Sequence, residues 1–324
     1  MSATIELEYR IDFSGVGSGT RFRCVSIEKK DNCQRLSRSV MEERPEGNHD
    51  LVTPSIFSVL NNYLLLFFSV TCLLSSVFIQ QLFYIIEQIR IGICVAPILG
   101  IILPVFLITR RFASGFRYQL AIRSLKPLVT AYVIVATLAA VVIVDFIYVL
   151  SQKFTPTPVD YLESLKEIKP TGIGSMLVTF FGLCIVVPIA EEVVFRGMIQ
   201  RIFSRHMGGV LALLLAGVFF GVIHLTPQLL LSMVAFGIFL GYVFFATSNL
   251  TYPMLAHGIF NTVAFVQLCF STEDELVSMP AYVRDYWLVG AATVVFVFLL
   301  IKMKKGDSVK SKTPPKSSDS SNVG

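Results

Sequence analysis

Eight apolar segments, each close to the about 20 residues that a helix needs to cross a bilayer, dominate this sequence. Backbone N–H and C=O groups in lipid must be hydrogen-bonded internally, so each segment is expected to be a helix. The segments are continuously apolar and far longer than barrel strands, which disfavours a β-barrel. The sequence therefore predicts an all-α, polytopic membrane helix bundle with about eight transmembrane helices, at residues 56–80, 90–109, 128–150, 173–195, 209–226, 228–247, 252–270 and 286–303.

The composition agrees with a membrane protein. Hydrophobic residues make up 54% of the 324 residues and charged residues 15%, whereas soluble domains carry about 25% charged residues. We therefore exclude a soluble globular enzyme, a disordered or collagen-like chain and a nucleic-acid-binding protein. The expected partners are the lipid bilayer and a membrane-associated protein or peptide, with no nucleic acid. The six cysteines show no CxxC pair, so neither a disulfide framework nor a structural zinc site is predicted.

Lysine and arginine residues set the expected orientation. They cluster between the second and third segments, after the fourth and after the eighth, which places all three clusters on one side of the membrane. We therefore expect a multi-pass integral membrane protein with both termini in the cytoplasm. A bacterial cell membrane is favoured over the alternative, the endoplasmic reticulum, because no retention or sorting signal is visible in the sequence.

The chain is expected to have four regions. Residues 1–55 form a polar cytosolic N-terminal extension, in which two stretches of alternating apolar and polar residues around a glycine-rich turn are typical of a β-hairpin. Residues 56–127 hold the first two membrane helices and a basic loop. Residues 128–303 form the membrane domain that carries the polar motifs, and residues 304–324 form a disordered basic tail.

Two adjacent carboxylates, Glu191 and Glu192, end the fourth apolar segment, where charge is costly. Glu192 and Arg196 are four residues apart on one helical face and can form an ion pair. Glu191 then points about 100° away, without a local cation, which suits a general base. The alternative interpretations are a purely structural ion pair and a water-exposed Glu191. Pro188, just before the pair, is expected to free a backbone carbonyl near the site.

Three more polar side chains lie in otherwise apolar segments. His224 ends the fifth segment, and His257 and Asn261 share one face of the seventh. Unpaired polar groups are costly in lipid, so we expect them to converge with Glu191 on one polar cavity; histidines bonded between helices are the alternative. Glu191 and His224 lie about 21–22 Å along their helices, but His257 lies only a few residues into its own. The helices must therefore tilt, or the fifth must begin deeper.

These residues form three motifs on separate apolar segments: EEVVFRG fits EExxxR, FGVIH fits FxxxH and HGIFN fits HxxxN. In this order they resemble the CPBP family of intramembrane proteases, which includes the type II CAAX prenyl endopeptidases and the bacteriocin-processing and immunity proteins. The resemblance covers roughly residues 130–270. It implies that residues 128–303 are a CPBP-like catalytic membrane domain, a hydrolase that cleaves a peptide bond of a membrane-presented protein or peptide.

Roles follow from the resemblance by matching position. Glu191 resembles the base that activates water, and His224 resembles the group that positions or polarises that water. Glu192 and Arg196 resemble a supporting ion pair. A base and a group that holds water are two of the parts that acyl transfer to water requires.

His257 and Asn261 resemble the pair that stabilises an oxyanion or holds water. Two histidines and a carboxylate can also bind zinc, and if a divalent metal takes part its ligands would be Glu191, His224 and His257. The spacing is not the HExxH of many metalloendopeptidases. We prefer a mechanism that requires no cofactor.

Two other functions remain as hypotheses. Intramembrane Glu, His and Arg also mark ion paths, so the chain could be a transporter or channel. Against this, the ionisable residues cluster in one third of the chain and no repeated halves are visible. A non-catalytic membrane scaffold is the other alternative.

Overall fold

The computed structural model describes residues 5–8, 21–24, 60–110, 115–271 and 286–307. The chain divides into two compact units, Met1–Val52 and Thr53–Gly324. In the first unit, β1 (Ile5–Glu8) and β2 (Arg21–Cys24) pair in antiparallel fashion, with Ile5 opposite Cys24. The hairpin predicted from the alternating pattern is confirmed, and the rest of the predicted extension lies outside the described residues.

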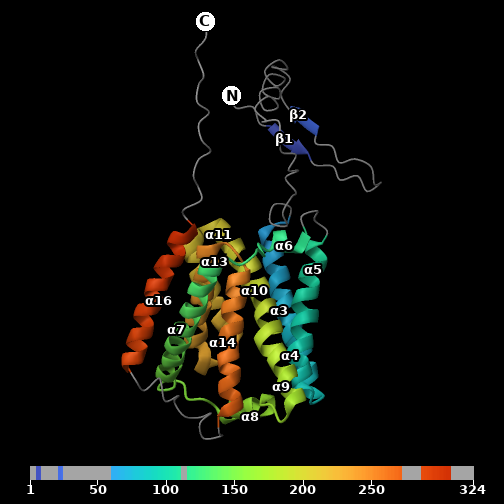
Figure 1. The fold of residues 1–324 in the computed structure, drawn as a ribbon. Coiled ribbons are helices and arrows are strands. Elements are labelled where there is room, and N and C mark those ends of the chain that lie inside the picture. Colours follow the sequence, from blue (N-terminus) through green and yellow to red (C-terminus); the bar gives the residue numbers. More distant parts are fainter. Residues whose placement is uncertain (1–4, 9–20, 25–59, 111–114, 272–285, 308–324) are drawn as a thin grey trace. The chain divides into compact units, whose positions relative to one another are not determined.

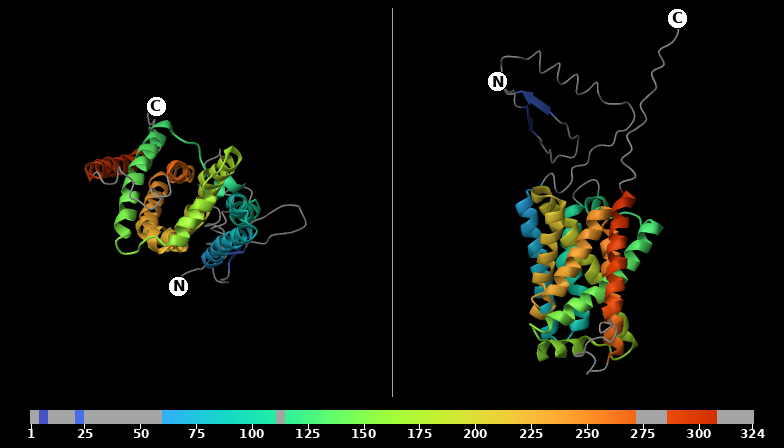
Figure 2. Two further views of the ribbon diagram at one scale, coloured as in Figure 1. Left: turned by 90° about the horizontal axis from the view of Figure 1, so that it is seen from below. Right: turned by 90° about the vertical axis from the view of Figure 1, so that its left-hand side faces the viewer.

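The second unit consists of helices that run side by side along the bundle, with α8 across one end (Figures 1 and 2). The α-helices are α3 (Asn62–Ile85), α4 (Ile89–Pro97), α5 (Leu103–Thr109), α6 (Gly115–Gln119), α7 (Pro127–Ser151), α8 (Val159–Ile168), α9 (Ile173–Phe180), α10 (Val187–Val194), α11 (Gln200–Met207), α12 (Gly209–Ile223), α13 (Leu230–Thr247), α14 (Thr251–Phe270) and α16 (Tyr286–Asp307). The π-helical segments are η1 (Ile98–Ile102), η2 (Phe181–Val186) and η3 (Phe195–Ile199), and η4 (Pro227–Leu229) is a 3-10 turn.

Seven helices in the described part of the chain are long and apolar enough to cross a membrane: Asn62–Ile85, Ile89–Thr109, Pro127–Ser151, Ile173–Met207, Pro227–Thr247, Thr251–Phe270 and Tyr286–Met303. The predicted fifth segment is α12, an apolar helix of 15 residues and so shorter than a full span. Counting α12 gives eight apolar helices, and the predicted all-α polytopic membrane bundle is confirmed.

Three helices extend several residues beyond their predicted ends. The first, α3, continues past 80 to Ile85. The fourth continues past 195 to Met207 and stops at Gly208, whose φ of 81° belongs to the left-handed region that ends helices. The last helix continues to Asp307, into the start of the predicted tail. The remaining residues of that tail, 308–324, lie outside the described residues.

The long fourth helix, Ile173–Met207, is continuous but not regular. Its α-helical piece α10, which carries both glutamates, is flanked by the π-helical segments η2 and η3. π-Turns widen a helix locally and occur often at functional sites. The irregularity therefore falls on both sides of the paired carboxylates.

Helices α12 and α13 approach each other closely through glycines. A Cβ at Gly237 would lie 2.8 Å from the backbone oxygen of Gly217, and one at Gly217 would lie 2.7 Å from the backbone nitrogen of Ile238. Real side chains cannot occupy such space, so the absence of side chains at these positions allows the two helices to approach closely. The contact fixes α13, whose backbone takes part in the site.

The turn that starts α14 is buried under the segment that follows α6. The Leu250 N–H donates to the Ala121 carbonyl (3.0 Å), and the Arg123 N–H donates to Oδ1 of Asn249 (3.1 Å). Leu250 is 0% and Asn249 4% exposed. Because α14 begins inside the protein, His257 lies deep although it is near the helix start. The sequence left two explanations for the expected depth mismatch, tilted helices or a deeper start of the fifth helix, and did not anticipate the buried start of the seventh helix.

Candidate functional site

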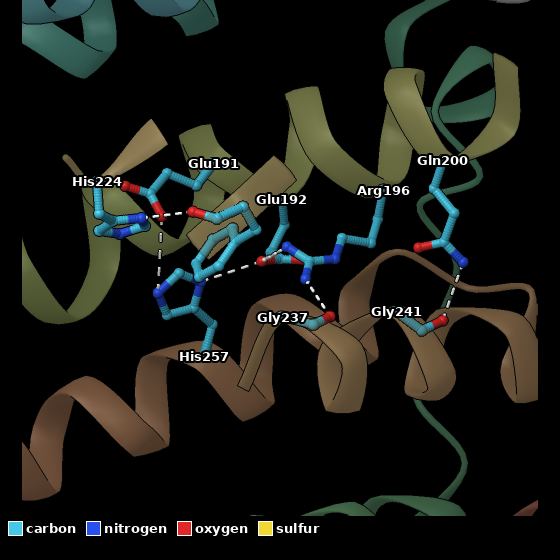
Figure 3. Close-up of polar contacts among 9 residues, drawn as sticks. Glu191, Glu192, Arg196, Gln200, His224, Gly237, Gly241 and His257 are labelled. Carbon is cyan, nitrogen blue, oxygen red and sulfur yellow. Dashed lines mark hydrogen bonds and ion pairs between the residues drawn. The ribbon is translucent and has the colours of Figure 1, made fainter. Parts of the chain in front are cut away.

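The predicted ion pair between Glu192 and Arg196 is confirmed. Nη1 of Arg196 donates to Oε1 of Glu192 at 2.8 Å, and both side chains are 0% exposed. Nη2 of Arg196 donates to the Gly237 carbonyl of α13 at 2.7 Å (Figure 3). The guanidinium also lies over the Phe220 ring, 4.9 Å from its centroid. Removing such a pair from water is costly, and the additional carbonyl and ring contacts offset part of that cost.

His257 joins the two glutamates. Its Nδ1 lies 3.0 Å from Oε1 of Glu192. An ionised carboxylate can only accept, so Nδ1 carries the proton, and in the neutral ring Nε2 keeps a lone pair. That Nε2 lies 3.9 Å from Oε2 of Glu191. The buried carboxylate therefore sets the tautomer of a ring whose second nitrogen is offered to the other carboxylate.

Glu191 differs from its neighbour in access and in partners. Its side chain is 23% exposed, and its carboxylate is directed toward the rings of His224 and His257 (Figure 3). The 3.9 Å separation from His257 is too long for a direct hydrogen bond but short enough for one water molecule to bond both groups at about 2.8 Å. The predicted division, one paired and one unpaired carboxylate facing different ways, agrees with this geometry.

His224 caps the end of α12. Its Nδ1 donates to the Phe220 carbonyl at 2.6 Å, which leaves Nε2 for other partners. The Phe220 ring packs against both histidines, with its centroid 4.8 Å from that of His224 and 5.8 Å from that of His257. Phe220 entered the sequence argument only as the first letter of a motif, but it is the side chain that spaces the two imidazoles.

Asn261 lies one turn beyond His257 and bonds a backbone carbonyl. Its Nδ2 donates to the Leu183 carbonyl of η2 at 2.8 Å. The N–H of Val187 bonds the Gly182 carbonyl, so the next bond in this register would join residue 188 to Leu183. Pro188 has no N–H, and Asn261 supplies the missing donor. The freed carbonyl expected near Pro188 is therefore present and is bonded by Asn261.

The structure gathers five of the six predicted site residues, and the sixth, Asn261, bonds the backbone of η2, the segment that precedes α10. The residues that the sequence did not identify are Phe220 as the spacer and Gly237 as a carbonyl acceptor. A usable signal existed for Gly237, since a helix position without a side chain leaves its carbonyl open to a second donor.

The donor types of Glu191, His224 and His257 are those that zinc accepts, and both imidazoles have Nδ1 engaged as metal-bound histidines do. As placed, however, they do not form a coordination group. Among the residues that the structure describes, no group of three or more His, Cys, Asp or Glu side chains is arranged to hold a metal ion. We derive no step through a metal.

A polytopic bundle with a carboxylate–histidine cluster held inside its apolar helices defines an integral membrane protein with a site suited to proton transfer. Residues 173–263 match the family model described as Type II CAAX prenyl endopeptidase Rce1-like. All three motifs lie within the matched region, so the resemblance recognised from the motifs is confirmed there. At the level of the family, this supports a CAAX-protease-like intramembrane endopeptidase. No curated protein and no solved structure matches the chain.

Proposed function

We propose that this protein is an intramembrane endopeptidase that hydrolyses a peptide bond of a membrane-presented protein or peptide, with water activated by Glu191. One observation carries the proposal: the accessible carboxylate of Glu191 lies 3.9 Å from the Nε2 of His257, whose Nδ1 is held by the buried Glu192. A base needs access to water and a partner that fixes that water. Glu191 is accessible and lies one water molecule's reach from His257, whereas Glu192 is fully buried and has no access to water.

In the proposed reaction, one water molecule donates hydrogen bonds to Glu191 and to Nε2 of His257. The water oxygen attacks the carbon of the scissile carbonyl while one water proton passes to Glu191. The electrons of the C=O double bond move to the carbonyl oxygen, which becomes an oxyanion. When the carbon–nitrogen bond then breaks, Glu191 returns the proton to the leaving amine. Atoms and charges balance without a further reactant.

The other residues of the cluster have supporting roles in this proposal. Glu192, neutralised by Arg196, holds His257 in the tautomer that accepts from water, as the buried carboxylate does in a Ser-His-Asp triad. In this proposal His224, across the Phe220 ring, polarises the water or, with both ring nitrogens protonated, donates from Nε2 to the oxyanion. Asn261 contributes by holding the Leu183 carbonyl under α10, beside the oxyanion role that the family resemblance implies for it.

The test compares peptide termini in membranes that contain the wild-type protein with those in membranes that contain Glu191→Ala. Glu163→Ala, a change to an exposed carboxylate on α8, is the matched control. New termini are expected with wild type and Glu163→Ala and are expected to be absent with Glu191→Ala. Equal termini in all three membranes would remove the proposal. A farnesylated peptide with a CAAX end is the first defined probe, because the matching family is described by that substrate class.

Two other experimental results would favour the alternative functions over an endopeptidase. Ion flux into reconstituted vesicles that Glu191→Gln abolishes would favour a transporter or channel. Normal cellular function of a Glu191→Ala, His224→Ala double variant would favour a non-catalytic scaffold.

We also propose that both termini lie in the cytoplasm, in a bacterial cell membrane rather than the endoplasmic reticulum. Reporter domains fused at either end and active only on one side of the membrane test the orientation. A periplasmic or lumenal signal from either fusion would contradict it.

A further inference from the structure

Gln200 makes a contact with α13 that resembles the contact of Arg196, one helical turn further along. Nε2 of Gln200 donates to the Gly241 carbonyl at 2.9 Å, as Nη2 of Arg196 donates to the Gly237 carbonyl at 2.7 Å (Figure 3). Each donor is 41 residues from its acceptor, so two successive turns of one helix are fixed to two successive turns of α13. We propose that Gln200 is a positioning residue that holds Arg196, and through it the Glu192–His257 contact. This inference rests on the proposed function.

Two buried atoms that lack partners point to the contact involved. Within the described part of the chain, Nε of Arg196 and Oε1 of Gln200 are both buried and without a hydrogen bond. The first is a donor and the second an acceptor, and side chains four apart on a helix are neighbours. In Figure 3 the amide oxygen of Gln200 is turned toward Arg196. A direct bond, or one bridging water molecule, satisfies both atoms at once.

The Gln200 amide cannot rotate by about 180° without losing its hydrogen bond to Gly241. Reversing Gln200 would place its oxygen against the Gly241 carbonyl oxygen, and two acceptors repel each other. The space is also fitted to the amide: a Cβ at Gly241 would come within 3.2 Å of Oε1 of Gln200. Gln200 is 2% exposed, so water does not replace its contacts easily. The orientation that presents the oxygen to Arg196 is therefore fixed by α13.

The proposed contact between Gln200 and Arg196 affects the geometry of the residues that take part in the reaction. Arg196 is held by the Glu192 carboxylate, the Gly237 carbonyl and, as we propose, the Gln200 amide. Without the amide, Arg196 keeps its other contacts but loses the one at Nε, so the guanidinium can shift slightly, and the carboxylate that orients His257 shifts with it. Small displacements of this kind lower turnover more than substrate binding.

The experiment uses the full-length protein in lipid nanodiscs. Gln200→Met removes both polar atoms at similar volume, and Ile202→Val, at a 3% exposed position on the same helix, is the control for simple loss of packing. We expect Gln200→Met to lower kcat about tenfold with KM within about twofold, and Ile202→Val to leave kcat unchanged. The ¹⁵N resonance of the Arg196 Nε–H, assigned by its absence in Arg196→Lys, is expected to shift in Gln200→Met only.

A kcat within about twofold of wild type, together with an unmoved Arg196 resonance, would overturn the proposal. If Gln200→Met does not fold, Gly241→Ala presses on the amide oxygen from the other side and is expected to lower kcat about threefold; an unchanged kcat there would likewise count against the contact. If the wild type cleaves nothing, the proposed function fails, whereas the Arg196 resonance still decides whether Gln200 holds the guanidinium.

Discussion

The two adjacent glutamates should differ strongly in how much stability the protein loses when each is replaced by glutamine. Glu192 is 0% exposed and shares Oε1 between Arg196 and His257. Glu192→Gln keeps the shape but leaves the Arg196 charge buried without its counter-ion, and breaking such a pair costs about 3–5 kcal/mol. Glu191 is partly exposed and lies 3.9 Å from its nearest ionisable partner, His257. Glu191→Gln should therefore change stability by less than about 0.5 kcal/mol.

The assay is thermal unfolding of a fluorescent-protein fusion in detergent, followed by size-exclusion chromatography. About 3 kcal/mol corresponds to a fall in Tm of about 4–5 °C for a chain of 324 residues, and the Glu191→Gln value should lie within about 1 °C of wild type. Equal melting temperatures for the two variants would refute the division of labour between a structural and an accessible carboxylate.

Three further results are expected. Asn261→Ala should destabilise the protein by about 1–3 kcal/mol because the Leu183 carbonyl loses its donor. Pro188→Ala in that background should recover part of the loss because it restores an N–H. A double-mutant cycle of melting temperatures measures this, and additive losses would contradict the proposed bond between Asn261 and Leu183. Phe220→Leu should lower kcat about tenfold or more, since the imidazoles lose their spacer, and unchanged turnover would count against that role. Dialysis against a strong chelator should leave peptide cleavage unchanged, and activity restored only by added zinc would show that the metal-free mechanism is wrong.

Much of the bundle could be predicted because the signals are local. Segment length and hydropathy locate the helices, and the four-residue spacing of Glu192 and Arg196 is enough to predict their pair, since both depend only on residues close in the sequence. The convergence of the histidines on Glu191 also followed from a general cost, that of unpaired polar groups among apolar helices.

The features that the sequence did not predict lie where contacts join segments that are distant in the sequence. The start of α14 is buried because residues near Ala121 bond to Leu250, and no local pattern reports that contact. The hydropathy pattern locates the fourth helix but does not reveal the π-helical segments on either side of α10. The bond from Asn261 to the Leu183 carbonyl was also not visible in the sequence, because the two residues are 78 positions apart; the oxyanion or water-holding role that the resemblance implies for Asn261 stays a prediction. Likewise, no local pattern singles out Gln200, because its partner, the Gly241 carbonyl, is 41 residues away.

The most direct measurement is the rate at which proteoliposomes cleave a membrane-presented peptide drawn from the new termini identified in membranes. Wild type, Glu191→Gln and Glu163→Gln are compared at equal protein in the same vesicles. A carboxylate that takes the proton from the attacking water should be worth about 10²–10⁴-fold in rate, so Glu191→Gln is expected to lose that much while Glu163→Gln cleaves as wild type does. Cleavage by Glu191→Gln at the wild-type rate would contradict the central role given to this carboxylate.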